Sequence, residues 1–172
     1  MNTKTRGFTL LEVVIVIALA AIILAAALPS LAESIRNNAV ASQNMSLIAM
    51  LNFSRSEAIR RSTEVTMVLT AGGDGWEAIV EDPNNEVDVE GCVPGQLRCT
   101  RQTDVLLTID SATLTFNNRG YIRGSDDTWE SETLYLQHEN CSGQNQRRRI
   151  DITPTGQVSS CALPCDSTRV CP

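Results

Sequence analysis

The chain has 172 residues and a mass of 18.7 kDa, which is enough for one globular domain with a non-globular segment and too short for a multidomain machine. Acidic residues outnumber basic ones by 20 to 14, and the net charge of -6 disfavours general nucleic-acid binding. The mean hydropathy of -0.07 is that of a soluble protein but conceals an apolar block of sixteen residues, Val13 to Leu28.

The N-terminal segment is laid out as a membrane signal whose cleavage site precedes the apolar region. Lys4 and Arg6 come first, then Gly7, and then an apolar stretch from Phe8 to Leu28. A secretory signal has its small-residue cleavage site after the apolar region, so cutting after Gly7 would leave the hydrophobic helix on the mature protein. Such a helix is about 31 Å long, enough to span a bilayer. The two bases predict a cytoplasmic N-terminus.

One acidic residue, Glu12, interrupts the apolar stretch and therefore needs a function. A carboxylate inside a membrane helix costs about 2.5 to 3.5 kcal/mol on insertion scales. If the bond after Gly7 is cut, the new amino group at Phe8 lies one helical turn before Glu12, and a neighbouring subunit presents the same amine. We therefore predict an intermolecular pairing of Glu12. The alternative is a tolerated charge near the end of a plain anchor.

These N-terminal residues resemble a known signal. The run Gly7-Phe8-Thr9-Leu10-Leu11-Glu12, the apolar block and Pro29 are similar to the class III signal of type IV pilins and type II secretion pseudopilins. The resemblance implies that a prepilin peptidase cuts after Gly7 and that Phe8 is then N-methylated. It also implies that Glu12 guides docking into the filament, and Pro29 matches the proline of the family.

The resemblance continues beyond the membrane segment. Arg55 to Arg61, Gly75-Trp76 and Arg148 to Gly156 look like the GspH/FimT group of minor pilins. The implied organisation is a leader peptide at 1–7, a transmembrane helix at 8–29, and a periplasmic pilin-like α+β domain at 30–172 with a disulfide-rich tail.

A helical pattern follows the apolar block. Apolar residues recur every three or four positions from Leu31 to Leu51, with polar residues between them. This spacing predicts one long helix from Phe8 to about Arg61, half in the membrane and half packed by one face against a sheet. Pro29 removes one helical hydrogen bond and crowds the preceding turn, so a kink or local melting is expected there.

The rest of the chain has a strand pattern. From Glu64 the apolar period changes to two, and the turn Gly72 to Gly75 leads into a second stretch, Trp76 to Val80, which predicts a hairpin. The expected fold is α+β, with one long N-terminal helix packed on an antiparallel β-sheet. Further strands are predicted at Val105 to Ile109, Ala112 to Phe116, Glu132 to His138 and Arg148 to Thr153.

Two segments fall outside this scheme. Glu77 to Glu90 holds six acids and no base, and the tail Ser159 to Pro172 holds three cysteines and two prolines. Neither segment is expected to form a long helix or strand, so we expect disulfide bonds to hold both in place. The oxygen-rich acidic segment is either a solvated loop, a calcium site without the order of an EF-hand, or a contact for a basic patch on a neighbouring subunit.

All six cysteines lie in the second half of the chain, and an exported chain would hold them as disulfides. Pro94-Gly95 favours a turn that pairs the first two. Zinc ligation by His138 with later cysteines is the alternative, although the spacing is loose. The predicted pairs are Cys92 with Cys99, Cys141 with Cys161, and Cys165 with Cys171.

No catalytic or cofactor motif is present. The single histidine, His138, is expected at the surface of a strand, and the turn glycines lack the lysine and helix of a phosphate loop. One basic run, Arg147-Arg148-Arg149, offers nucleic-acid contacts, with Arg147 and Arg149 on one face of a strand and Arg148 on the other. DNA-uptake pilins of the FimT type are known for a C-terminal glycine-arginine motif, whereas Gly156 to Ser160 contains no arginine.

The sequence thus predicts a non-catalytic minor pilin that primes or caps a type IV pilus, with no cofactor and no bound metal. The implied partners are a prepilin peptidase, other major and minor pilins or pseudopilins, and the inner membrane. Two alternatives remain: a GspH-like minor pseudopilin of a type II secretion system, and a DNA-binding minor pilin in natural transformation, which the acidic net charge disfavours.

Overall fold

The computed structural model describes residues 9–72, 75–85, 88–102, 107–124, 128–142, 144–165 and 167–171. The chain divides into two compact units, Met1–Arg36 and Asn37–Pro172. The predicted cleavage and methylation positions, Gly7 and Phe8, lie outside the described residues.

Within the first unit, the described residues form the start of helix α1 (Leu10–Arg61). Thr9 is its N-cap, because its hydroxyl oxygen accepts a hydrogen bond from the backbone N–H of Glu12 at 3.2 Å. Pro29 lies inside the helix, and the helical assignment is unbroken across it. Local melting at Pro29 is therefore not observed, and a kink there stays a prediction.

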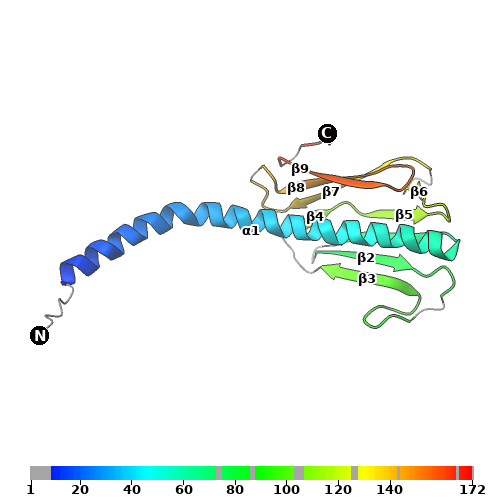
Figure 1. Ribbon diagram of the computed structural model, residues 1–172, viewed down its shortest axis with the longest axis horizontal. Helices are drawn as coiled ribbons and strands as arrows, with labels where there is room; N and C mark the ends of the chain where they lie inside the picture. The colour runs from blue at the N-terminus through cyan, green and yellow to red at the C-terminus, as the bar shows by residue number, and fades with distance from the viewer. Residues whose placement is uncertain are drawn as a thin grey trace, which may run out of the picture. The chain divides into compact units, whose positions relative to one another are not determined.

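The second unit consists of the C-terminal part of α1 and two antiparallel sheets (Figure 1). Sheet A has five strands in the order β3-β2-β1-β5-β6, and sheet B has four in the order β4-β7-β8-β9. The strands are β1 (Val65–Gly72), β2 (Gly75–Glu81), β3 (Gln96–Gln102), β4 (Leu107–Ile109), β5 (Ala112–Phe116), β6 (Ile122–Arg123), β7 (Glu132–His138), β8 (Arg147–Ile152) and β9 (Val158–Leu163).

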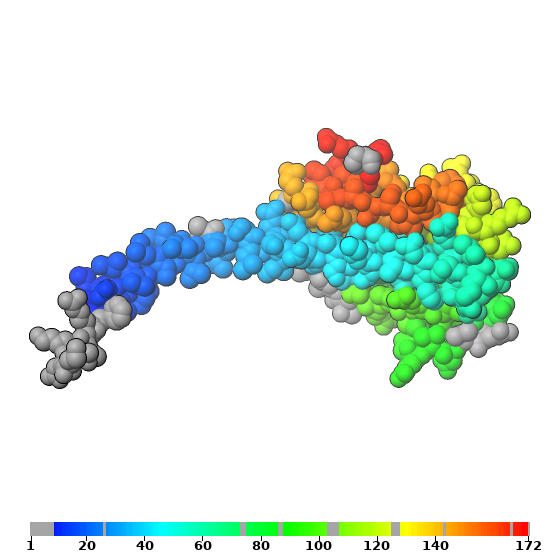
Figure 2. Space-filling model, in the orientation of Figure 1, coloured from blue at the N-terminus to red at the C-terminus, as the bar shows by residue number. Residues whose placement is uncertain are grey.

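Helix α1 contacts both sheets. Two consecutive side chains point to different sheets: the Gln43 amide donates to Gln102 of β3, and the Asn44 amide donates to Ser160 of β9, both at 3.0 Å. Within this unit, Figure 2 shows the cyan part of α1 in front, with orange strands of sheet B visible along one side of it and green strands of sheet A along the other. The shared core is formed by buried apolar side chains of α1 and of both sheets, among them Leu47, Leu51, Met67, Leu114, Phe116, Leu136 and Ile150.

The α+β class and most strands agree with the sequence-based prediction, whereas the single sheet does not. Strands β5 and β7 have the predicted bounds, and β8 begins one residue early. The predicted strand 105–109 is described only from Leu107 onward. Alternation of apolar residues shows which side chains face the core but not which strands pair, so it could not separate one sheet from two.

Three strands were missed because each lies at a sheet edge or is very short. Among the described strands, β3 pairs with β2 alone and β9 with β8 alone, and β6 has two residues. The tail from Ser159 was expected to have no long regular segment, but its first five residues belong to β9 (Val158–Leu163). An edge strand buries less of each face, and β9 accordingly carries Ser159 and Ser160 instead of an alternating apolar pattern.

The structure contains the predicted Cys92–Cys99 disulfide but not the other two predicted pairs. The observed pairs are Cys141–Cys165 and Cys161–Cys171. Leu163 at the end of β9 pairs with Arg147 at the start of β8, so the residues after β9 lie at the same end of sheet B as the β7–β8 connection, which contains Cys141. Cys161 lies inside β9, and the tail after β9 folds back so that Cys171 forms a disulfide with it.

The disulfides provide a stability prediction. Replacing both Cys141 and Cys165 by serine should lower the free energy of unfolding by about 3.5 kcal/mol, because their disulfide closes a loop of 24 residues. The matched replacement of Cys92 and Cys99 should lower it by about 2.5 kcal/mol, because that disulfide closes a loop of 7 residues. Urea unfolding of periplasmic protein measures both values. Non-reducing peptide mapping checks the pairing, and a Cys141–Cys161 cross-link would contradict it.

Candidate functional site

The first candidate site is the apolar surface of α1 in the first unit. Its large apolar side chains are exposed, including Leu10 at 83% and Ile23 at 69%. Among the described residues, α1 is the one helix that is long and apolar enough to cross a membrane, and its apolar part is not buried within the protein. A contiguous apolar surface of this kind requires a bilayer or other apolar helices to cover it.

Glu12 lies in the first turn of this apolar helix. Glu12 and Val13 donate backbone hydrogen bonds to the Thr9 carbonyl at 3.1 and 3.3 Å, which fixes the start of the helix. Thr9 and Glu12 have the spacing of a capping box, and a carboxylate in the first turn is favoured by the helix dipole. For the part of the chain that the structure describes, no ion pair to the Glu12 carboxylate is recorded. The intermolecular pairing of Glu12 thus stays a prediction.

The second candidate site is the junction at the C-terminal end of α1, where two of the quoted sequence motifs meet. Arg55 Nε donates to the Gly120 carbonyl at 3.2 Å. Gly156 has a φ of +74°, and a Cβ there would lie 2.1 Å from the Gly120 carbonyl oxygen and 2.9 Å from Arg55 Nε. Only glycine fits this close approach. The sequence did not predict that Arg55 and Gly156, a hundred residues apart, are neighbours.

An ion network joins the same helix end to the β2–β3 connection. Arg61 contacts Glu57 at 2.8 Å and Asp82 at 3.1 Å, and the Asp82 side chain is fully buried. The hydrogen bond from Arg60 lowers the pKa of Glu57, with Arg61 adding to this effect and burial opposing it. The network ties the acidic segment to the helix through Asp82, which therefore has a structural role.

The lowered pKa of Glu57 predicts a pH dependence of stability. A carboxyl group with a lower pKa in the folded state stabilises the fold above its ordinary value of 4.5, and this contribution is lost as the pH falls through the folded-state pKa. We expect Glu57→Gln to cost about 1 to 2 kcal/mol at neutral pH and progressively less below about pH 4. Chemical unfolding at several pH values measures this, with the replacement of an exposed acid, Glu139→Gln, as the control. A cost independent of pH would contradict the prediction.

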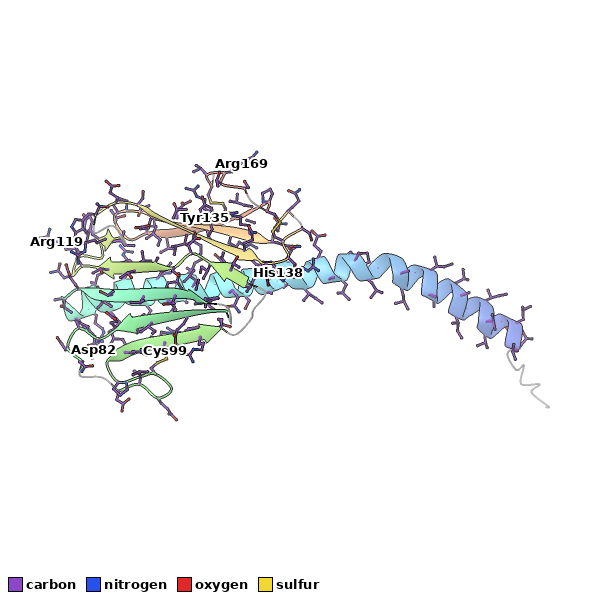
Figure 3. All side chains as sticks on the ribbon, turned by 180° about the vertical axis from the view of Figure 1, so that it is seen from behind. Asp82, Cys99, Arg119, Tyr135, His138 and Arg169 are labelled. Atoms are coloured by element: carbon purple, nitrogen blue, oxygen red, sulfur yellow. A yellow bond between two sulfur atoms is a disulfide. The ribbon has the colours of Figure 1, made fainter. Side chains whose placement is uncertain are left out.

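The basic run lies on strand β8 of sheet B, and Arg147 and Arg149 contact other side chains of the protein. Arg147 and Arg149 share one face, as predicted, with their guanidinium carbons 4.3 and 5.9 Å from the Tyr135 ring centre, on the sheet where Figure 3 labels Tyr135. Arg149 also pairs with Asp151 at 2.8 Å and donates to the Thr168 carbonyl at 3.1 Å, which holds the tail. These contacts give Arg149 a structural role.

The residues considered as zinc or calcium ligands have the following positions in the structure. His138 is 4% exposed, so its predicted surface position is wrong: it follows the buried Leu134 and Leu136 on the core face of β7. The zinc alternative fails because Cys141, Cys161 and Cys165 form disulfides. Within the described ranges no group of three or more histidine, cysteine or acidic side chains is arranged to hold a metal. Glu86, one of the six acids of the segment Glu77 to Glu90 that was considered as a calcium site, lies outside those ranges.

Comparison with known proteins gives one family and one fold. Residues 43–156 match the family model of the type II transport protein GspH, and residues 2–28 match the prokaryotic N-terminal methylation motif. No curated protein sequence matches the chain.

Two crystal structures of the type IV minor pilin FimU from Pseudomonas aeruginosa (strain PAO1) are similar to the chain. For the form in space group P21, the identity is 20%, the match covers 71% of this chain and 87% of that chain, and the TM-score is 0.52. For the form in P65, the identity is 20%, the coverages are 69% and 90%, and the TM-score is 0.48. The P21 form shows a shared fold.

Proposed function

The chain belongs to the GspH family, whose model matches residues 43–156, and on this premise we propose that it is a minor pilin that primes or caps a type IV pilus. The family and the fold are those of structural pilin subunits. The observation that carries the proposal is the long, exposed apolar helix that begins at Leu10 and contains Glu12 in its first turn. Such a helix suits both storage in a bilayer and packing among equivalent helices in a filament.

The proposal includes a processing and location scheme. A prepilin peptidase removes residues 1–7, Phe8 is methylated, and residues 8–29 anchor the protein in the inner membrane. Residues 30–172 then lie in the periplasm, which is an oxidising compartment. The methylation motif at residues 2–28 supports cleavage and methylation, and three disulfides in the folded unit support the periplasmic location.

The choice between a type IV pilus and a type II secretion system requires an experiment. The family takes its name from a type II transport protein, whereas the structural relative is a minor pilin of a type IV pilus. We expect deletion of the gene to reduce surface pili strongly while secretion of exported enzymes continues, and expression of the full chain to restore the pili. Sheared-pilus yield and culture-medium proteins measure the two outcomes. Normal piliation with lost secretion would favour the pseudopilin alternative.

A further inference from the structure

Two exposed aromatic side chains line one hollow on the second unit. Within the described residues, Tyr121 and Trp129 are the exposed aromatics, at 44% and 45%, whereas Trp76 and Phe116 are buried. They line a cavity of about 280 Å³ together with Asn117 and Arg119. We call these four residues the aromatic hollow. Figure 3 shows Arg119 at the end of this unit where α1 ends.

The β5–β6 loop, which carries Asn117, Arg119 and Tyr121 of the aromatic hollow, is held by hydrogen bonds before any ligand binds. The side-chain oxygen of Asn117 accepts hydrogen bonds from the backbone N–H groups of Arg119 and Tyr121, both at 2.9 Å. The backbone N–H of Asn117 donates to the Tyr121 carbonyl at 2.9 Å, and Arg55 holds the Gly120 carbonyl. A ligand would therefore meet an ordered loop, which lowers the entropic cost of binding.

Trp129 is also held in place. The guanidinium of Arg123 lies over its ring at 5.4 Å from the ring centre, and Arg123 is itself paired with Glu64 at 3.3 Å. The neighbouring Ile122 and Phe116 supply the core side of this region and are fully buried. The fold therefore does not need the rings of Tyr121 and Trp129 for its core, although both are kept in a defined position at the surface.

We propose that the aromatic hollow binds a neutral sugar ring of a polysaccharide. Indole and phenol rings present flat apolar faces that match the C–H face of a pyranose, and amide and guanidinium groups at the rim are suited to its hydroxyl groups. The hollow is open to solvent, and its volume of about 280 Å³, just below the range of small-molecule pockets, has room for one ring of a longer sugar chain.

The charge and the small exposed area of the aromatic hollow argue against DNA and against a protein as its ligand. The chain has a net charge of -6, the exposed Glu130 next to Trp129 offsets the charge of Arg119, and Arg123 is paired with Glu64, so the hollow offers no cluster of unbalanced cations for a polyanion such as DNA. A stable protein partner usually covers about 800 Å² on each side, whereas the exposed aromatic surface here is confined to two residues. A neutral glycan satisfies both constraints.

The test uses the full chain in a detergent without a sugar headgroup, such as lauryldimethylamine oxide. Labelled protein is applied to an array of neutral pyranose oligosaccharides based on glucose, galactose, mannose and N-acetylglucosamine, with uronate oligomers and single-stranded DNA on the same array. We expect retention on at least one neutral class. Trp129→Ala and Tyr121→Ala should each lower that retention at least tenfold, and the control Val93→Ala, at an exposed site outside the aromatic hollow, should leave it unchanged.

Tryptophan fluorescence gives a second measurement. Trp129 is exposed and Trp76 is buried, so acrylamide quenching in the wild type reports mainly on Trp129, and the retained sugar should protect it. Unchanged melting temperatures of the variants separate lost binding from lost folding. Absence of retention on every neutral class, retention that survives Trp129→Ala, or retention only on uronates or DNA would each overturn the proposal.

Discussion

Replacing Glu12 with alanine is expected to remove the protein from filaments while leaving its membrane insertion and cleavage intact. Insertion should improve, because the helix loses a carboxylate that costs about 2.5 to 3.5 kcal/mol in a bilayer. Filament entry should fall at least tenfold, because the proposed partner of Glu12 is the amino group of another subunit. Immunoblots of sheared pili against the membrane fraction measure the ratio.

The matched control for this experiment is Glu33→Ala. Glu33 is also an exposed acid of α1, but it lies outside the apolar block. Its replacement should leave filament entry unchanged, so a loss in both variants would indicate a general effect of charge on the helix. Normal entry of Glu12→Ala into pili would show that the proposed docking role of Glu12 is wrong.

A larger side chain at Gly7 is expected to abolish processing. Gly7→Leu should leave all of the protein in the precursor form, and Gly7→Ala should reduce cleavage, because the proposed cut follows a small residue between the charges and the apolar block. Intact-mass spectrometry of membrane-extracted protein distinguishes the precursor from a mature chain that begins at methylated Phe8. Thr5→Ala, in the same leader, is the control and should be processed normally.

Two results would contradict the processing scheme. One is a wild-type N-terminus other than Phe8, which would place the cleavage elsewhere. The other is normal cleavage of Gly7→Leu, which would show that a small residue is not required. Because the uncleaved chain keeps Lys4 and Arg6 beside the membrane, Gly7→Leu should also fail to enter pili.

Features that depend on neighbours in sequence were predictable. The apolar block, the acid at Glu12 and the small residue at Gly7 are read directly along the chain, and together they indicated the family. The bounds of β5 and β7 followed from alternation, because a strand with one buried face has a period of two. The Cys92–Cys99 pair was predictable because a turn between them brings their ends together.

Features that depend on strand pairing were decided only by the tertiary structure. The register of β9 on β8 brings Cys165 near Cys141 and leaves Cys161 to the tail, and no local pattern in the tail encodes that register. The burial of His138 likewise depends on which face of β7 meets the core. The contact of Arg55 with Gly120, and of Gly120 with Gly156, joins segments far apart in the chain, so it exists only once α1, β5 and β8 have packed.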